Sequence, residues 1–155
     1  MTNNHFDDIL SIDSNNLEVG IIFLSIQSKK KEVAAFLDEL KTLLEKQDFN
    51  IDTDLILIRK KKTGEDQRFS TPYTLLDLDY DTDDVVEHLK ELTVEMYSET
   101  KIDKDDLNPP LLFVFGKDIN HKLVYVKLKI KGDKRRHILC VSFHYAKEPM
   151  EFPYA

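Results

Sequence analysis

The chain has 155 residues, of which 41% are hydrophobic and 33% are charged, and its formal net charge at pH 7 is -7. This is the composition of an ordinary globular protein, and it excludes repetitive and low-complexity classes of chain. The length is sufficient to bury a hydrophobic core, so we expect a single domain over residues 1–155.

Cysteine content and hydropathy predict where the protein resides. The single cysteine, Cys140, excludes an intrachain disulfide and favours a reducing compartment. The longest apolar run, VGIIFL at residues 19–24, is too short to cross a bilayer. It also lacks the basic start and the small-residue cleavage site of a signal peptide. We therefore expect a cytoplasmic protein with no membrane partner.

Charge is distributed unevenly along the chain. Residues 116–155 contain nine Lys or Arg against four Asp or Glu and carry +5, whereas residues 1–115 contain 13 against 25 and carry -12. Because salt screens charges over roughly 8 Å at physiological ionic strength, local charge decides what a surface attracts. The acidic total therefore does not exclude RNA as a partner of the C-terminal segment.

The first half of the chain predicts both strands and helices. LEVGIIFLSI (residues 17–26) favours a buried strand, although a short helix also fits, and Ser28 is a candidate N-cap of a helix that extends to about residue 47. The apolar stripe of this helix consists of Val33, Phe36, Leu37, Leu40 and Leu44. LILIRKKKT (residues 55–63) predicts a strand with a basic end, followed by a loop around Gly64 and Pro72.

The clearest helical pattern lies in DLDYDTDDVVEHLKELTVEMYSET, residues 77–100. Aspartates at its start suit the positive end of a helix dipole. Aspartates alternate from Asp77 as in a calcium-binding loop, but Thr82 and His88 occupy the positions that require glycine and glutamate, so we expect no metal site. The stripe of this helix consists of Val85, Leu89, Leu92 and Met96.

Three strand-like segments complete the chain. They are LLFVFGKDI (residues 111–119), LVYVKLKI (residues 123–130) and HILCVSFHYA (residues 137–146). The short polar turns between them favour an antiparallel meander. The predicted fold is therefore α+β, with helices packed on an antiparallel sheet.

The last two strands alternate polar and apolar residues, which predicts a hairpin with two unlike faces. If Ile130 pairs with His137, Lys127 faces Cys140 and Tyr125 faces Ser142. Leu139, Val141 and Phe143 then lie on the core side with the valines of the first strand. The residues expected on the opposite side are Tyr125, Lys127, Lys129, Cys140, Ser142 and His144.

The polar side of this hairpin carries the residue types of metal-independent RNA cleavage. Attack by a ribose 2′-hydroxyl on its phosphodiester needs a base, an acid and positive charge. Histidine and tyrosine transfer protons, and lysine stabilises the transition state. A solvated sheet face carries the same residue types, so composition alone leaves both interpretations open.

Two further groups are candidate RNA contacts. The basic turn KRRH at residues 134–137 predicts phosphate binding by Lys134, Arg135 and Arg136, although a solvated hairpin tip explains it equally well. Tyr154 is a candidate for stacking on a base, whereas Tyr145 falls on the core side.

The order of these segments resembles a group of bacterial toxins. LVYVKLKI and HILCVSFH, preceded by LDLDYDTDDVVEHLKELTVEMYSE, resemble the MqsR-like branch of the RelE/ParE toxin superfamily. FVFGKDI and the C-terminal SFHYA and PMEFPY are similar to a related ParE/RelE-like group. The resemblance covers about residues 33–154. Residues 1–27 form an N-terminal extension, and residues 147–155 are expected to be an extended tail because they contain two prolines.

This resemblance implies a RelE/ParE-like toxin of a type II toxin–antitoxin pair. Such a toxin is an mRNA endoribonuclease, acting on free RNA or on the ribosome, which uses no cofactor and is inactive while bound to a cognate antitoxin. The resemblance implies catalytic roles for Tyr125 and His144, assisted by Lys127. The expected substrate-binding residues are Lys117, Lys129, Lys134, Arg135, Arg136 and Tyr154.

Two departures from the family pattern leave alternatives open. Ser98 and Leu112 occupy positions where the family carries a lysine and a glutamine. One alternative is a ParE-like toxin that poisons DNA gyrase by binding, without an enzymatic step. The other is an inactive relative that only binds an antitoxin.

Overall fold

The structure is a computed structural model that describes residues 25–60, 64 and 66–155. Six strands form one sheet in the order β1-β3-β4-β5-β6-β2. The strands are β1 (Ser25–Ile26), β2 (Leu55–Leu57), β3 (Tyr97–Lys101), β4 (Leu112–Ile119), β5 (Lys122–Lys131) and β6 (His137–Tyr145). All neighbours are antiparallel except β2 and β6, which are parallel, so the sheet is mixed rather than purely antiparallel.

Three α-helices lie within the described residues, and they confirm the predicted α+β single-domain class. They are α3 (Lys30–Leu44), α4 (Thr71–Leu78) and α5 (Thr82–Lys90), with single 3-10 turns η2 (Gln67–Phe69) and η3 (Val94–Met96). None of these helices is long and apolar enough to cross a membrane. Apart from Ser25 and Ile26, the strand predicted in LEVGIIFLSI lies outside the described residues.

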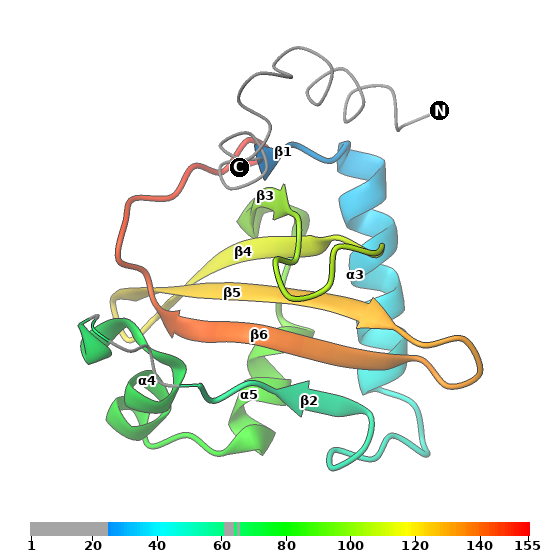
Figure 1. The fold of residues 1–155 in the computed structure, drawn as a ribbon, viewed down its shortest axis with the longest axis horizontal. Helices are drawn as coiled ribbons and strands as arrows, with labels where there is room; N and C mark the ends of the chain where they lie inside the picture. Colours follow the sequence, from blue (N-terminus) through cyan, green and yellow to red (C-terminus); the bar gives the residue numbers. More distant parts are fainter. Residues whose placement is uncertain (1–24, 61–63, 65) are drawn as a thin grey trace.

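The main core lies between the sheet and helices α3 and α5, which cover one of its faces (Figure 1). The predicted stripe of α3 is confirmed, because Val33, Leu37, Leu40 and Leu44 are buried. From the sheet, Val126 and Phe143 point into the same core and are almost completely buried. Burial of these side chains is the principal stabilising contribution to the fold.

The start of α3 differs from the prediction by one residue. Lys29 is its N-cap, and its backbone N–H donates to the Glu32 carboxylate at 2.8 Å. Ser28 instead forms a hydroxyl–hydroxyl hydrogen bond with Thr100 of β3 at 2.7 Å, and its backbone N–H donates to the Tyr97 phenol. Ser28 therefore anchors the chain to the sheet rather than capping the helix.

Two further predictions about helices were wrong. The segment around Pro72 is α4 rather than a loop, because proline is tolerated in the first turn of a helix and Ser70 caps it. The helix predicted within residues 77–100, with an apolar stripe as far as Met96, ends at Lys90. Beyond η3, residues 97–101 pair with β4 as β3 and bury the Tyr97 ring, so sheet pairing overrides the helical spacing.

Both C-terminal turns lie near their predicted positions, but the pairing register of the last hairpin differs from the prediction. Asn120 and His121 have φ angles of 52° and 67°, as a tight two-residue hairpin requires. In the β5–β6 hairpin, Lys127 faces Ser142 and Tyr125 faces His144, two residues beyond their predicted partners.

Two shifts of one residue explain this register, one at the turn, where Lys131 rather than Ile130 pairs with His137, and one at a bulge. Lys127 pairs with Ser142, whereas the next residue, Leu128, pairs with Cys140, so Val141 is left between the two pairs. The shift at the turn pairs Cys140, which is fully buried, with Leu128 on the core side. It also moves Leu139 to the polar side opposite Lys129, contrary to the prediction.

The second face of the sheet is covered by the loop at residues 102–111 and by the C-terminal tail at residues 147–155. In Figure 1 the tail leaves the end of β6 and runs along the side of the sheet toward β1. A Cβ atom on Gly116 would lie only 2.7 Å from the Phe152 ring and 3.0 Å from the sulfur of Met150, so the tail packs directly on β4. This face holds the predicted site.

Candidate active site

Tyr125 and His144 lie directly opposite each other on neighbouring strands. They form a cross-strand pair of β5 and β6, and their rings stack with centroids 5.2 Å apart and planes inclined by 13°. The prediction that the two side chains share one side of the sheet is confirmed. The register shift brings them closer than expected, because the predicted register placed Ser142 opposite Tyr125.

The imidazole of His144 has a defined orientation. Its Nδ1 lies 2.8 Å from the backbone carbonyl oxygen of Tyr145, and the side chain is buried. Because a carbonyl oxygen only accepts hydrogen bonds, Nδ1 carries the proton. In the neutral ring Nε2 is then the basic nitrogen, so the fold selects one tautomer.

The phenol of Tyr125 stays protonated far above neutral pH. Burial and the nearby Glu99 carboxylate raise its pKa from 10.0 to about 12, because both disfavour the phenolate. Glu99 is itself held in place, since the Ser25 hydroxyl donates to it at 2.5 Å and the Lys101 ammonium lies 3.7 Å away. Tyr125 is therefore suited to donate a proton or a hydrogen bond rather than to act as a base.

The pair borders a cavity of about 640 Å³ between the sheet and the tail. One wall comes from β1 and β3, and the opposite wall from residues 147–151 of the tail. Besides Tyr125 and His144, the side chains that bear on its chemistry are Ser98, Glu99, Lys101, Lys147, Glu148 and Glu151. Its size is that of a small-molecule or nucleotide site.

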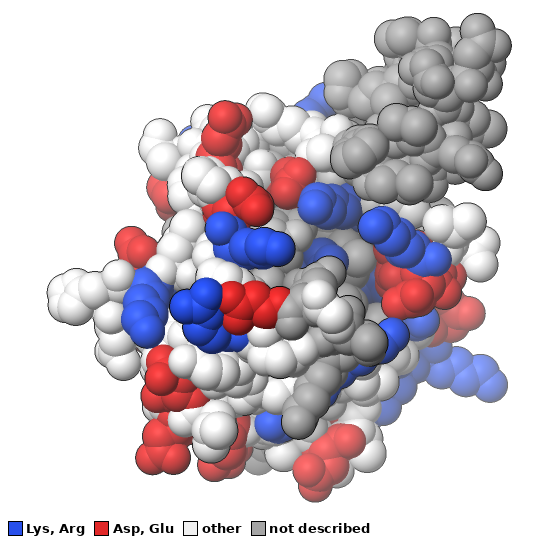
Figure 2. All heavy atoms as spheres, turned by 60° about the vertical axis from the view of Figure 1, so that its left-hand side comes forward, with Lys and Arg blue, Asp and Glu red and all other residues white. Residues whose placement is uncertain are grey.

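Charges of both signs surround this cavity. Lys101 and Lys147 are in its lining together with three glutamates, and the Lys127 ammonium lies 5.9 Å from the centroid of the Tyr125 ring. Figure 2, which brings the left-hand side of Figure 1 forward, also shows basic and acidic side chains interspersed. The cavity thus offers cations for a phosphate but not the concentrated positive charge that the sequence predicted.

Two of the predicted substrate-binding lysines lie outside the cavity lining. Lys117 pairs with Val124 on the helix-covered side of the sheet, where its ammonium contacts Glu91 and His88 of α5 at 2.5 Å each. Lys129 is fully buried, and its ammonium lies 2.9 Å from Asp103 and 3.3 Å from Asp106. Both lysines connect segments of the fold. The burial and the ion pairs of Lys129 do not support a substrate contact for this residue.

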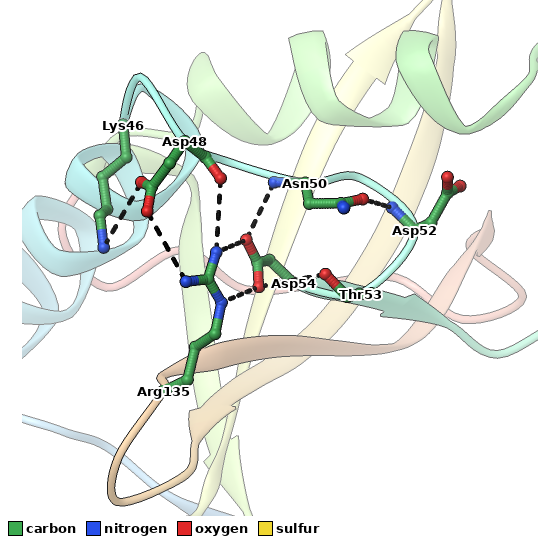
Figure 3. Close-up of polar contacts among 7 residues, drawn as sticks. All are labelled: Lys46, Asp48, Asn50, Asp52, Thr53, Asp54 and Arg135. Carbon is green, nitrogen blue, oxygen red and sulfur yellow. Dashed lines mark hydrogen bonds and ion pairs between the residues drawn. The ribbon is translucent and has the colours of Figure 1, made fainter.

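The predicted basic turn lies at the far end of the hairpin from the tail (Figure 1). The Arg135 guanidinium donates two hydrogen bonds of 2.7 Å to the Asp54 carboxylate (Figure 3). Arg136 binds Glu39 of α3 at 2.9 Å, and Lys134 is exposed at the tip. These three residues are not brought together with Tyr125 and His144.

Tyr154 also has a structural environment. Its ring stacks on Tyr97 with centroids 5.8 Å apart, and its hydroxyl donates to the Ser28 backbone carbonyl at 2.5 Å. These contacts fasten the end of the tail beside β1 and β3. Tyr154 does not border the Tyr125–His144 cavity.

The sequence analysis missed the charged residues of the cavity lining, among them Glu99, Lys101 and Lys147. Glu99 and Lys101 lie on β3, which was not predicted as a strand, and Lys147 begins the tail. The only signal was the YSETK sequence, which suits a strand as well as a helix end. Among the described residues, no group of three or more His, Cys, Asp or Glu side chains is placed to hold a metal ion.

Comparison of the chain with protein-family models, with curated proteins and with solved structures gives no match. The resemblance to toxins therefore stays an expectation carried by the sequence segments quoted above.

Proposed function

We propose that this protein is a RelE/ParE-like toxin that cleaves RNA in the cytoplasm without a metal and is inhibited by a cognate antitoxin. The observation that carries the proposal is the Tyr125–His144 pair. A basic imidazole nitrogen and a protonated phenol face each other across two strands at the edge of a cavity with lysines around it. These groups match the base, acid and cations that 2′-hydroxyl attack requires.

The proposed reaction divides proton transfer between the two rings. Nε2 of His144 takes the proton of a ribose 2′-hydroxyl, and the 2′-oxygen attacks the adjacent phosphorus. The bond from phosphorus to the 5′-oxygen breaks, and the Tyr125 phenol gives its proton to this leaving oxygen. A 2′,3′-cyclic phosphate and a 5′-hydroxyl result, and transfer of the proton from His144 to the phenolate restores both groups.

The lysines supply the electrostatic part of this mechanism. Lys101 and Lys147 line the cavity and Lys127 lies above the Tyr125 ring, so their charge acts near the oxygens of the pentacoordinate phosphorus, where negative charge develops. Burial and the Glu99 carboxylate keep the phenol protonated until a strongly basic oxygen leaves. A 5′-alkoxide is more basic than a phenolate whose conjugate acid has a pKa of about 12, so the proton transfer is favourable.

A cleavage assay on mixed-sequence RNA in the presence of a chelator tests the proposal. Tyr125→Phe and His144→Gln each remove one proton-transfer group and are expected to slow cleavage by roughly 10²–10⁴-fold. Lys46→Gln, which changes an exposed residue outside the cavity lining, serves as the matched control. Intact RNA with the wild-type chain, or equal cleavage by all variants, counts against the proposal.

A second candidate, toxicity by binding DNA gyrase, is favoured by one observation. Four of the predicted RNA-binding cations, Lys117, Lys129, Arg135 and Arg136, are ion-paired or hydrogen-bonded to carboxylates within the chain. The cavity therefore has less positive charge than an RNA channel usually has. Inhibition of gyrase supercoiling by a chain that leaves RNA intact would establish this alternative.

A further inference from the structure

A second hollow, of about 490 Å³, lies across the tail from the Tyr125–His144 cavity. Lys147, Glu148 and Pro149 line both hollows, so a short stretch of tail separates them. The remaining walls come from η2, α4, the start of β5 and the end of β6. Figure 1 shows α4 and the start of the tail at the same side of the molecule.

Aromatic rings form the floor and one wall of this hollow. Tyr145 is buried at its base and is fixed by a hydrogen bond of 2.5 Å from its hydroxyl to Asp77. Tyr73 of α4 packs edge-on against Tyr145, with centroids 6.5 Å apart, yet 38% of its surface is exposed. Phe69 adds a third ring. Tyr73 thus presents aromatic surface to the solvent above a rigid support.

Cations are interleaved with these rings. The Lys122 ammonium lies 4.7 Å from the centroid of Tyr145, and the Arg68 guanidinium lies 5.9 Å from that of Phe69. Both cations also contact carboxylates, since Lys122 is 3.6 Å from Asp77 and Arg68 is 2.6 Å from Asp66. The Lys122 and Arg68 side chains are 60% and 70% exposed. The ion pair of Lys122 is exposed and consists of one contact, so a phosphate can replace its carboxylate at small cost, whereas Arg68 binds Asp66 through two nitrogens and is more costly to release.

We propose that this hollow is a subsite for an unstacked nucleobase of single-stranded RNA, with a flanking phosphate bound by Lys122 or Arg68. The inference rests on the proposed function, because it places this base on the strand that enters the neighbouring cavity. Aromatic surface interleaved with cations is the combination that binds single-stranded nucleic acid. The shared wall of the two hollows lets one strand occupy both.

Binding of a labelled 2′-O-methyl RNA octamer to the full chain, measured by fluorescence anisotropy, tests the subsite. This probe lacks the attacking 2′-hydroxyl, so binding is measured without cleavage. Tyr73→Ala is expected to weaken binding roughly 5- to 100-fold, and Tyr73→Phe to retain it, because the stacking surface is kept. Leu76→Ala, at an 82% exposed position of the same helix, should bind like the wild type.

A salt titration tests the phosphate contact. Lys122→Gln should weaken binding and reduce the slope of log affinity against log salt concentration by about 0.7, the value for one phosphate contact on a single strand. An unchanged slope in both Lys122→Gln and Arg68→Gln would overturn this part of the proposal.

The remaining outcomes separate the subsite from the proposed reaction. If the Tyr73→Ala variant binds the octamer as tightly as the wild type, the subsite proposal is wrong, even if the protein cleaves RNA. No octamer binding by the wild type, or displacement of the octamer by an acidic peptide that binds more tightly through Tyr73, overturns it as well. Tyr73-dependent binding by a chain that does not cleave RNA supports the subsite and refutes the proposed reaction.

Discussion

The imidazole of His144 is held from two directions, by the Tyr145 carbonyl and by the Tyr125 ring. A side chain held in this way loses little further freedom when a substrate binds, which is a requirement for a positioned base. The phenol of Tyr125 is held against the same imidazole. The paired rings thus define a fixed point on this face.

The charge of Glu99 determines part of the acidity of Tyr125. Glu99→Gln removes the carboxylate but keeps a hydrogen-bond acceptor for Ser25. We expect the pKa of Tyr125 to fall from about 12 but to stay above 10.0, because burial is the larger cause of its elevation. Ultraviolet titration of the phenols, with Tyr125→Phe subtracted to isolate this residue, measures the change. A Tyr125 pKa that does not move in Glu99→Gln contradicts the assigned electrostatic contact.

At the scale of residues, the sequence predicted the pair but not its surroundings. Alternation along LVYVKLKI and HILCVSFHYA placed Tyr125 and His144 on one side, because side chains on a strand alternate between faces. Glu99 and Lys101 lie on β3, which the sequence did not predict as a strand, and Lys147 lies in the irregular tail. Their approach depends on long-range packing, which local patterns do not encode.

Among the elements, the short strand β2 depends on the Arg135–Asp54 contact drawn in Figure 3. Asp54 precedes β2 and accepts hydrogen bonds from Arg135 and from the Asn50 backbone N–H, and its carbonyl accepts from the Ile138 N–H of β6. Asp54→Asn should lower the free energy of unfolding by about 1–3 kcal/mol, because it weakens the hydrogen bonds that Arg135 and the Asn50 N–H donate to this buried carboxylate. Urea unfolding of this variant beside Asp52→Asn, its exposed neighbour, measures the difference.

The same carboxylate predicts a loss of stability in acid. Its hydrogen bonds to Arg135 lower the pKa of Asp54 from 3.8 to about 2. Its contribution is therefore complete above pH 3.8 and is lost as the pH falls toward 2. Asp54→Asn should show a smaller fall in stability between these values than the wild type, and an identical fall would exclude this role.

Helix α4 completes the edge of β6 beyond the end of β2. The backbone N–H groups of Phe143 and Tyr145 donate to the buried hydroxyls of Thr71 and Thr74 at 3.1 and 3.0 Å. Thr74→Val should destabilise the protein by about 1–3 kcal/mol, because the shape is kept while the Tyr145 N–H loses its acceptor. Thr42→Val on the exposed side of α3 is the matched control in thermal unfolding. Equal melting temperatures for the two variants would contradict the edge-capping role.

The elements that sequence patterns predicted are those whose signals are local. The amphipathic helix α3 and the three C-terminal strands follow from residue spacing and turn residues. The bulge at Val141 does not follow from such local signals, because it arises from how β6 fits β5 and the core at the same time. β3 was missed for a similar reason, since its pairing partner β4 lies further along the chain.

In the whole molecule, the basic C-terminal segment and the acidic remainder of the chain are complementary. The ion pairs that join them include Lys117–Glu91, Lys129–Asp103, Arg135–Asp54 and Arg136–Glu39. A charge count along the sequence cannot show which cations are engaged in this way. The asymmetry of +5 against -12 therefore reflects the assembly of the fold as well as any attraction for RNA.

The tail packs at Gly116 on the face of the sheet that holds the candidate site. Gly116→Ala adds a methyl group that would lie 2.7 Å from the Phe152 ring, so it should displace the tail and lower the free energy of unfolding by about 1–3 kcal/mol. In a Phe152→Ala background the same change should cost much less, because the obstructing ring is gone. Urea unfolding of the four chains measures this coupling. Equal costs in both backgrounds would show that the tail does not pack there.

The most direct test of the proposed function concerns the chemical ends of RNA fragments formed in the presence of this protein. Mass spectrometry of fragments formed with a chelator present should find 2′,3′-cyclic phosphates and 5′-hydroxyls, because in the proposed reaction His144 activates the ribose 2′-hydroxyl. These ends should disappear in His144→Gln. Fragments with 3′-hydroxyl and 5′-phosphate ends, or cyclic phosphate ends that persist undiminished in His144→Gln, would contradict it.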